Sequence, residues 1–148
     1  MNPKNDIKLA ETLLGAQYDL TGSASPLPGE NSNYLIETPD GARFVLKIAG
    51  DELPSAMLEV EHRAVERIHS AGVDLMLPRL VMTSSGAMEA VRERPGGERA
   101  RARLLEYVPG TPWCDAGLAT DERLEQLGRT LASMDEACLL YTSDAADD

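Results

Sequence analysis

The sequence has no apolar run that approaches the ~20 residues of a membrane-spanning helix. Its first residues also lack the uninterrupted apolar core of a secretory signal peptide, so we expect a cytoplasmic protein. Basic residues are scarce: 14 Lys and Arg stand against 25 Asp and Glu, which gives a formal net charge of -11. Nucleic acid and anionic membranes both require a basic surface, so neither is expected as a partner. A small anionic ligand needs only a local positive site and is not excluded.

Residues that usually build metal or nucleophilic sites are also few. The two cysteines, Cys114 and Cys138, have no metal-site spacing, and His62 and His69 are seven apart instead of four. We expect both histidines on the surface. No Ser-His-Asp set and no pair of catalytic carboxylates can be assembled from order and spacing. The chain is therefore predicted to hold neither a catalytic residue nor a metal site.

The 148 residues, 43% of them hydrophobic, suffice for one domain with a core. The last eleven, CLLYTSDAADD at 138–148, do not continue the preceding pattern. They resemble the translation of a transposon-type sequencing adapter and are excluded from the fold prediction. On this view the natural chain continues beyond residue 137 with a different sequence.

The remaining segments are organised around residues 27–48. An alternating apolar segment over 33–38 and a second apolar segment over 44–48 are joined by Pro39-Asp40-Gly41, which predicts a β-hairpin. Lys47 stands within the second, apolar strand, where a lysine is unfavourable unless it has a partner. The loop before the hairpin, residues 28–32, contains Gly29 and Asn31, which tolerate the backbone conformation of a phosphate-binding nest. A plain strand-to-strand turn is the alternative for this loop.

Helical spacing of Ala56, Val60, Ala64 and Ile68 predicts a helix over 54–70 that covers the sheet. Glu61 borders this apolar stripe and is the candidate to pair with Lys47. Glu59 and Glu66 are the alternative partners for Lys47. The interpretation without a functional role is a solvated helix face on which Glu59 forms an ion pair with Arg63.

Further elements are a lead-in helix over 6–14 that stops at Gly15, a weak strand over 17–27, and strands over 77–82, 88–93 and 102–108. The last strand runs into Glu106-Tyr107-Val108-Pro109-Gly110, which is typical of a hinge between two lobes. The backbone groups of Glu106 and Val108 would then lie beside a purine ring. An ordinary loop is the alternative. A helix over 121–137 is capped by Thr120, and its stripe of Leu124, Leu127, Leu131 and Met134 is expected to pack on a segment outside the chain.

This order of segments resembles the aminoglycoside phosphotransferase family of small-molecule kinases, and within it the hydroxylysine kinase type, including forms fused to a class III aminotransferase. The resemblance covers residues 10–137. It is carried by NSNYLIET, DG and RFVLKIA within 31–49, LEVEHRAVERI at 58–68, RLLEYVPGTPW at 103–113 and LEQLGRTLASMDEA at 124–137.

The resemblance implies an α+β, protein-kinase-like N-terminal lobe over 1–108, with a five-stranded antiparallel sheet and one packed helix. Residues 109–137 would form the hinge and the first helix of a second lobe. The family uses ATP or GTP with Mg²⁺ to phosphorylate a hydroxyl group, here of a small amine-bearing alcohol. Its catalytic aspartate and metal-binding acid would lie in the second lobe, so this chain alone should be inactive.

Carried over by resemblance, Lys47 would hold the α- and β-phosphates and Glu61 would pair with it. The phosphates would be covered by Gly29, Glu30, Asn31, Ser32 and Asn33, and adenine would lie against Glu106, Tyr107 and Val108. The rival interpretations are an aminoglycoside or macrolide resistance kinase and a non-enzymatic α+β module in which Lys47 and Glu61 are structural.

Overall fold

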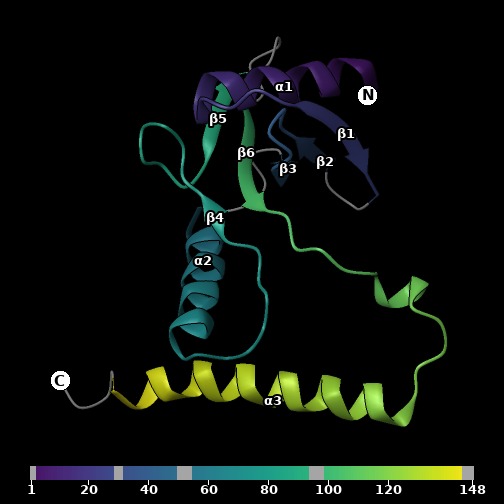
Figure 1. Cartoon of the computed structure of the whole chain (residues 1–148). Coiled ribbons are helices and arrows are strands. Elements are labelled where there is room, and N and C mark those ends of the chain that lie inside the picture. The colour runs from purple at the N-terminus through teal and green to yellow at the C-terminus, as the bar shows by residue number, and fades with distance from the viewer. Residues whose placement is uncertain (1–2, 29–31, 50–54, 94–98, 145–148) are drawn as a thin grey trace. The chain divides into compact units, whose positions relative to one another are not determined.

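A computed structural model describes residues 3–28, 32–49, 55–93 and 99–144 (Figure 1). The chain divides into two compact units. The first consists of Met1–Leu58 and Pro78–Tyr107, and the second of Glu59–Leu77 and Val108–Asp148. Each unit is described by itself below.

The first unit is built on one antiparallel sheet. Its strands are β1 (Ser23–Leu27), β2 (Ser32–Glu37), β3 (Arg43–Ala49), β4 (Leu80–Val81), β5 (Ala90–Glu93) and β6 (Arg99–Glu106). The order across the sheet is β1-β2-β3-β6-β4, and β5 also pairs with β6. The α+β class with an antiparallel sheet is thus confirmed.

The sheet has six strands instead of the five predicted, because the strand position beside β6 is shared. Leu80 of β4 lies opposite Leu105, and Ala90 of β5 lies opposite Ala102 on the same strand. Between them the chain leaves the sheet in a turn closed by the Thr83 N–H and the Ala87 carbonyl, 2.9 Å apart. The strands predicted over 77–82 and 88–93 are thus both present, as the shorter β4 and β5, and both pair with β6, while residues 82–89 between them do not join the ladder.

The β2–β3 hairpin agrees with the prediction. The Thr38 N–H donates to the Ala42 carbonyl at 3.0 Å, and the Gly41 N–H donates to the Thr38 carbonyl at 2.9 Å. Gly41 has φ +87°, which a residue without a side chain adopts at little cost. The Thr38 hydroxyl also contacts the Asp40 carboxylate and lowers the pKa of Asp40 below its usual value.

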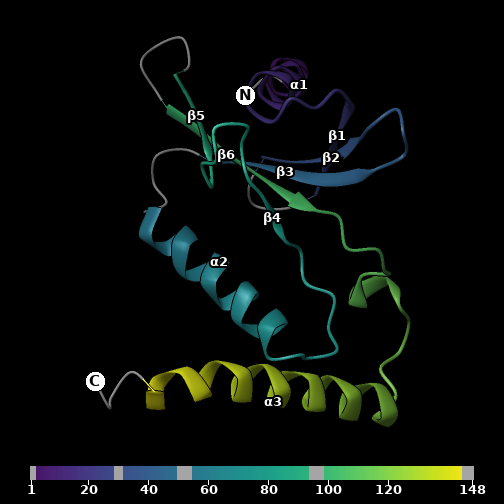
Figure 2. The same cartoon turned by 60° about the vertical axis from the view of Figure 1, so that its left-hand side comes forward.

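The helix packed on this sheet is α1 (Pro3–Tyr18), seen nearly end-on above one face of the sheet in Figure 2. Its buried residues join one core with the strands. The core consists of Ala10, Leu13, Leu14 and Tyr18 from α1 and Ala24, Tyr34, Ile36, Leu46, Ile48, Ala90, Ala100, Ala102 and Leu104 from the sheet. The sequence had assigned the covering role to the helix over 54–70. No described residue of that helix belongs to this core. Periodicity identified an apolar stripe but not the surface on which it packs.

Helix α1 is longer than the predicted 6–14. Gly15 lies inside it and is not its end; the helix stops at Tyr18, and Asp19 has φ +52°. A glycine inside a helix costs about 1 kcal/mol relative to alanine. Burial of the neighbouring Leu13, Leu14 and Tyr18 outweighs that cost.

The second unit contains most of α2 (Ser55–Ser70), the short helix η1 (Trp113–Asp115) and α3 (Asp121–Asp144). The Arg67 Nε donates to the Ala137 carbonyl at 3.3 Å, and Ile68 and Ala137 are buried. As predicted, Thr120 caps α3, with its hydroxyl 3.3 Å from the Arg123 N–H. The helix continues past the predicted end at 137, because each further residue of a formed helix adds a backbone hydrogen bond.

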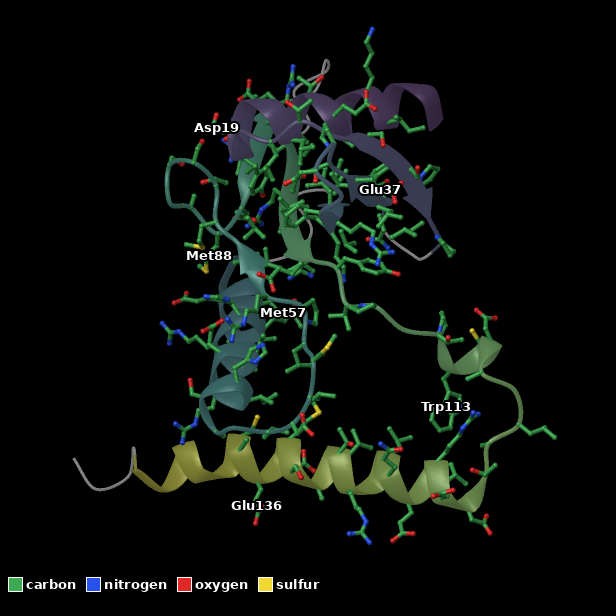
Figure 3. All side chains as sticks on the ribbon, viewed as in Figure 1. Asp19, Glu37, Met57, Met88, Trp113 and Glu136 are labelled. Carbon is green, nitrogen blue, oxygen red and sulfur yellow. The ribbon has the colours of Figure 1, made fainter. Side chains whose placement is uncertain are left out.

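The expected stripe on α3 is largely exposed in this unit: Leu124, Leu127 and Leu131 keep 43–51% of their surface accessible. Trp113 of η1 is likewise half exposed (Figure 3). No helix in the described ranges is both long and apolar enough to span a bilayer.

Candidate functional site

The candidate site lies on the face of the sheet that α1 does not cover. Side chains alternate along a strand, so residues next to core positions point to the opposite face. Residues directly opposite each other on neighbouring strands share a face. The strand register therefore assigns three rows of side chains to this second face.

The first row is polar. Lys47 of β3 lies opposite Asn33 of β2 on one side and opposite Arg103 of β6 on the other. All three are half-buried. The Asn33 Oδ1 is buried and has no hydrogen-bond partner within the described part of the chain. The ammonium of Lys47 makes no ion pair with any residue that the structure describes.

The second row, one step toward the hairpin turn, is apolar. Leu35, Val45 and Leu105 lie opposite one another across β2, β3 and β6, and Leu80 extends the row on β4. Each is half-buried. An apolar row next to a cationic row suits a ligand that joins a flat apolar group to an anionic group.

The third row lies at the end of the sheet nearest the hairpin turn and contains Arg43 of β3, beside Tyr107. The guanidinium of Arg43 lies over the ring of Tyr107, 4.4 Å from its centroid, in a cation–π contact. The Tyr107 N–H donates to the Arg43 carbonyl at 3.2 Å, and the Glu106 N–H donates to the Arg79 carbonyl at 2.9 Å.

These bonds involve the residues of the predicted hinge, whose contact with a purine ring stays a prediction. The Glu106 N–H is committed to Arg79 within the sheet and is not available to a ligand. The Glu106 carbonyl and the Val108 N–H remain as the candidate ligand-binding groups. Val108 is the first residue after the sheet unit and is 36% exposed.

The other sequence-predicted site residues have different outcomes. Gly29, Glu30 and Asn31 lie outside the described residues. Ser32 begins β2 and lies opposite Ile48, so it shares the α1 face and not the face of Lys47.

Glu61 is an exposed residue of α2 in the second unit, whereas Lys47 belongs to the first, so their pairing stays a prediction. The expected Glu59–Arg63 ion pair is present.

Sequence reasoning missed Arg103. The signal was the alternation Ala100-Arg101-Ala102-Arg103-Leu104, which is typical of a strand with one small apolar face and one basic face. The alanines are buried under α1, and the arginines lie on the other face.

A pocket of the sheet unit lies away from this face. This pocket, of about 310 Å³, lies where α1 ends and the hairpin turns, and Asp19 (Figure 3), Asp40 and Phe44 are among its lining residues. Phe44 packs against the α1 core, so this pocket does not belong to the face of Lys47. Within the described ranges, no three His, Cys, Asp or Glu side chains come together as a metal site.

A sequence model described as "APH: Phosphotransferase enzyme family" matches residues 23–139. No curated protein matches the chain.

Solved structures that are similar in fold include the following three. A microcompartment-associated aminopropanol kinase has 23% identity and a TM-score of 0.70 over 88% of this chain and 40% of that one. The amicoumacin kinase hAmiN, in complex with AMP-PNP, Ca²⁺ and Ami, has 17% identity and a TM-score of 0.57 over 74% and 32%.

An aminoglycoside phosphotransferase from Alicyclobacillus acidocaldarius subsp. acidocaldarius DSM 446 has 21% identity and a TM-score of 0.59 over 93% and 35%. The chain thus spans well under half of each of these structures.

Proposed function

Because this chain belongs to the phosphotransferase enzyme family, APH, we propose that it is the nucleotide-binding part of a small-molecule kinase. The whole enzyme transfers the γ-phosphoryl group of ATP to a hydroxyl group of a small amine-bearing alcohol such as hydroxylysine. The observation that carries the proposal is the half-buried Lys47, which has no described ion pair and stands beside an apolar row. Aminopropanol kinase, a fold neighbour, supports an amine-bearing alcohol as acceptor.

The second face of the sheet supplies two kinds of contact to a nucleotide. The Lys47 ammonium binds the α- and β-phosphates as a donor-only cation. Leu35, Val45 and Leu105 bury the face of the base. The Glu106 carbonyl and the Val108 N–H bind its edge, and the Glu61 carboxylate orients Lys47. The same contacts suit GTP.

Mg²⁺, when bound, neutralises phosphate charge in this class of reaction. The described residues offer no set of acids that fits the ion, so we assign it no ligands here. The sequence also contains no His-Gly-Asp loop for a catalytic aspartate. We therefore assign this chain nucleotide binding and not phosphoryl transfer.

The test is the affinity of the 148-residue chain for ATP with Mg²⁺, measured by calorimetry, in wild type and Lys47→Ala. A charge-assisted contact to phosphate contributes about 1.5–3 kcal/mol, so we expect the Kd to rise at least about tenfold. Lys8→Ala removes an exposed lysine of α1 and is the matched control, with unchanged affinity expected.

Two outcomes would overturn the proposal: a folded wild-type chain that binds no nucleotide, or a Lys47→Ala variant that binds as well as wild type. Either would favour the non-enzymatic module. A resistance kinase is the second candidate, supported by the amicoumacin and aminoglycoside kinases among the fold neighbours. Phosphorylation of antibiotics but not of simple amino alcohols by the whole enzyme would select it.

A further inference from the structure

Lys47 has two neighbours in its row, and they differ in kind. Asn33 offers a carbonyl oxygen that accepts hydrogen bonds, whereas Arg103 is a cation that only donates. Lys47 lies directly opposite each of them.

The backbone pattern brings Asn33 closer. In an antiparallel ladder, hydrogen-bonded pairs alternate with non-hydrogen-bonded pairs, whose Cα atoms are about 4.5 Å apart instead of about 5.5 Å. Thr38 and Ala42 form a hydrogen-bonded pair, so in the same register Asn33 and Lys47 form a non-hydrogen-bonded pair. Tyr107 bonds to Arg43, so on the other side Lys47 and Arg103 form the wider type.

The side-chain oxygen of Asn33 also lacks a hydrogen-bond donor among the described residues. This atom, Oδ1, is buried, and a buried acceptor without a donor destabilises a fold. The Lys47 ammonium carries three donors and makes no described ion pair. The repulsion between Lys47 and Arg103 favours the same side chain direction, toward Asn33.

We propose that Asn33 is a positioning residue for Lys47 in the nucleotide-bound state. Its side-chain carbonyl accepts a hydrogen bond from the Lys47 ammonium and holds that cation on the ligand face of the sheet, leaving the other ammonium donors for phosphate oxygens. This role rests on the proposed nucleotide binding.

The test compares Asn33→Leu, which is close in size but accepts no hydrogen bond, with Asn33→Asp, which keeps an acceptor oxygen. Affinity is measured for ATP with Mg²⁺ and for adenosine, which has no phosphate. We expect Asn33→Leu to weaken ATP binding about tenfold, the effect of one hydrogen bond to a charged group, and to change adenosine binding less than twofold. Glu37→Gln, on the same strand and face but outside the Lys47 row, is the control and should leave both affinities unchanged.

A second readout is the ¹⁵N signal of the Lys47 ammonium. A hydrogen-bonded ammonium exchanges its protons slowly, so the signal should appear on addition of ATP in wild type and in Asn33→Asp, but not in Asn33→Leu.

Equal weakening of ATP and adenosine binding, or the same ammonium signal in all three proteins, would overturn the inference. If Asn33→Leu fails to fold, loss of the signal in Asn33→Asp overturns it as well. Lys47→Ala in the same assay separates the two proposals: unchanged ATP binding there refutes nucleotide binding by this face, not the role of Asn33 alone.

Discussion

Tyr18 carries a buried hydroxyl group on α1. Only 7% of the residue is exposed, and the hydroxyl lies 3.3 Å from the Ala102 carbonyl, to which it donates. The pKa of Tyr18 is raised to about 12, mainly by burial; the nearby Glu89 charge acts in the same direction, because both disfavour the phenolate, and a backbone hydrogen bond at Leu104 partly offsets them. The sheet unit thus holds this residue in its neutral form.

The stability of the protein should therefore fall as the pH rises from about 10 to about 12. In that window the unfolded chain releases the Tyr18 proton while the folded chain keeps it, so the unfolded state is favoured. The loss should be about 1–2 kcal/mol, measured by urea unfolding at several pH values. Tyr18→Phe should flatten this dependence and remove the tyrosinate absorbance step near pH 12, while Tyr107→Phe keeps both. A step near pH 12 that survives in Tyr18→Phe would contradict the assignment.

Gly22 is required by close packing. A Cβ at this position would lie 2.8 Å from the Glu37 carbonyl oxygen and 3.1 Å from Cγ2 of Ile36. Gly22→Ala should therefore lower the free energy of unfolding by about 1–3 kcal/mol, because backbone must move to admit the methyl group.

Gly15→Ala is the matched control for Gly22→Ala. Its Cβ would meet nothing closer than 3.8 Å, and alanine should stabilise α1 by about 0.5–1 kcal/mol. Urea denaturation of both variants measures the difference, and equal effects would show that close packing at Gly22 is not the cause.

At the scale of elements, the edge of the sheet beside β6 is held by an ion pair. Arg101 of β6 donates through Nε to Glu89 Oε2 at 2.9 Å, and its NH2 group contacts the other carboxylate oxygen. The side chains are only 12% and 19% exposed. Glu89 stands immediately before β5, so this pair ties the segment between β4 and β5 to β6.

Breaking that pair should destabilise the sheet edge. Arg101→Met leaves a largely buried carboxylate and should cost about 2–3 kcal/mol in the free energy of unfolding. Arg129→Met breaks the Glu125–Arg129 pair of α3, whose side chains are 66% and 77% exposed, and should cost less than about 0.5 kcal/mol. The double variant Glu89→Met/Arg101→Met should lose less than Arg101→Met alone; a larger loss would mean that packing and not charge is what the pair contributes.

At the scale of the whole molecule, burial is uneven between the two units. The sheet unit contains nearly all fully buried side chains, such as Leu46 and Leu104, whereas on α3 Ala137 is the one buried residue among those described. Elements with few buried contacts open locally at small free-energy cost.

Hydrogen exchange should therefore separate the units. Amides of β2, β3 and β6 should exchange only through global unfolding, and those of α3 at least about a hundredfold faster, as measured by mass spectrometry. Protection of α3 equal to that of β3 would contradict this expectation and would indicate that Leu124, Leu127 and Leu131 are covered in solution. If a second copy of the chain covers these leucines, the protection of α3 should increase with protein concentration.

Several features follow from the sequence alone because they depend on neighbouring residues. Asp40-Gly41 between two apolar segments defines the hairpin and places Lys47 on its second strand. Thr120 before an apolar-periodic segment defines the start of α3, and Ala56 to Ile68 define the extent of α2. The family resemblance was also carried by such local segments, and the match over residues 23–139 bears out the phosphotransferase family, though not the hydroxylysine kinase type within it.

The tertiary structure decided which elements pack or pair with one another, because local sequence patterns do not determine this. Periodicity shows that a helix has an apolar face, but only packing determined that α1 covers the sheet and that its helix continues through Gly15. Pairing between strands distant in sequence divided the edge beside β6 between β4 and β5. Strand pairing also placed Asn33 and Arg103 on either side of Lys47. The register between strands decides which side chains share a row, and the local sequence of one strand does not determine that register.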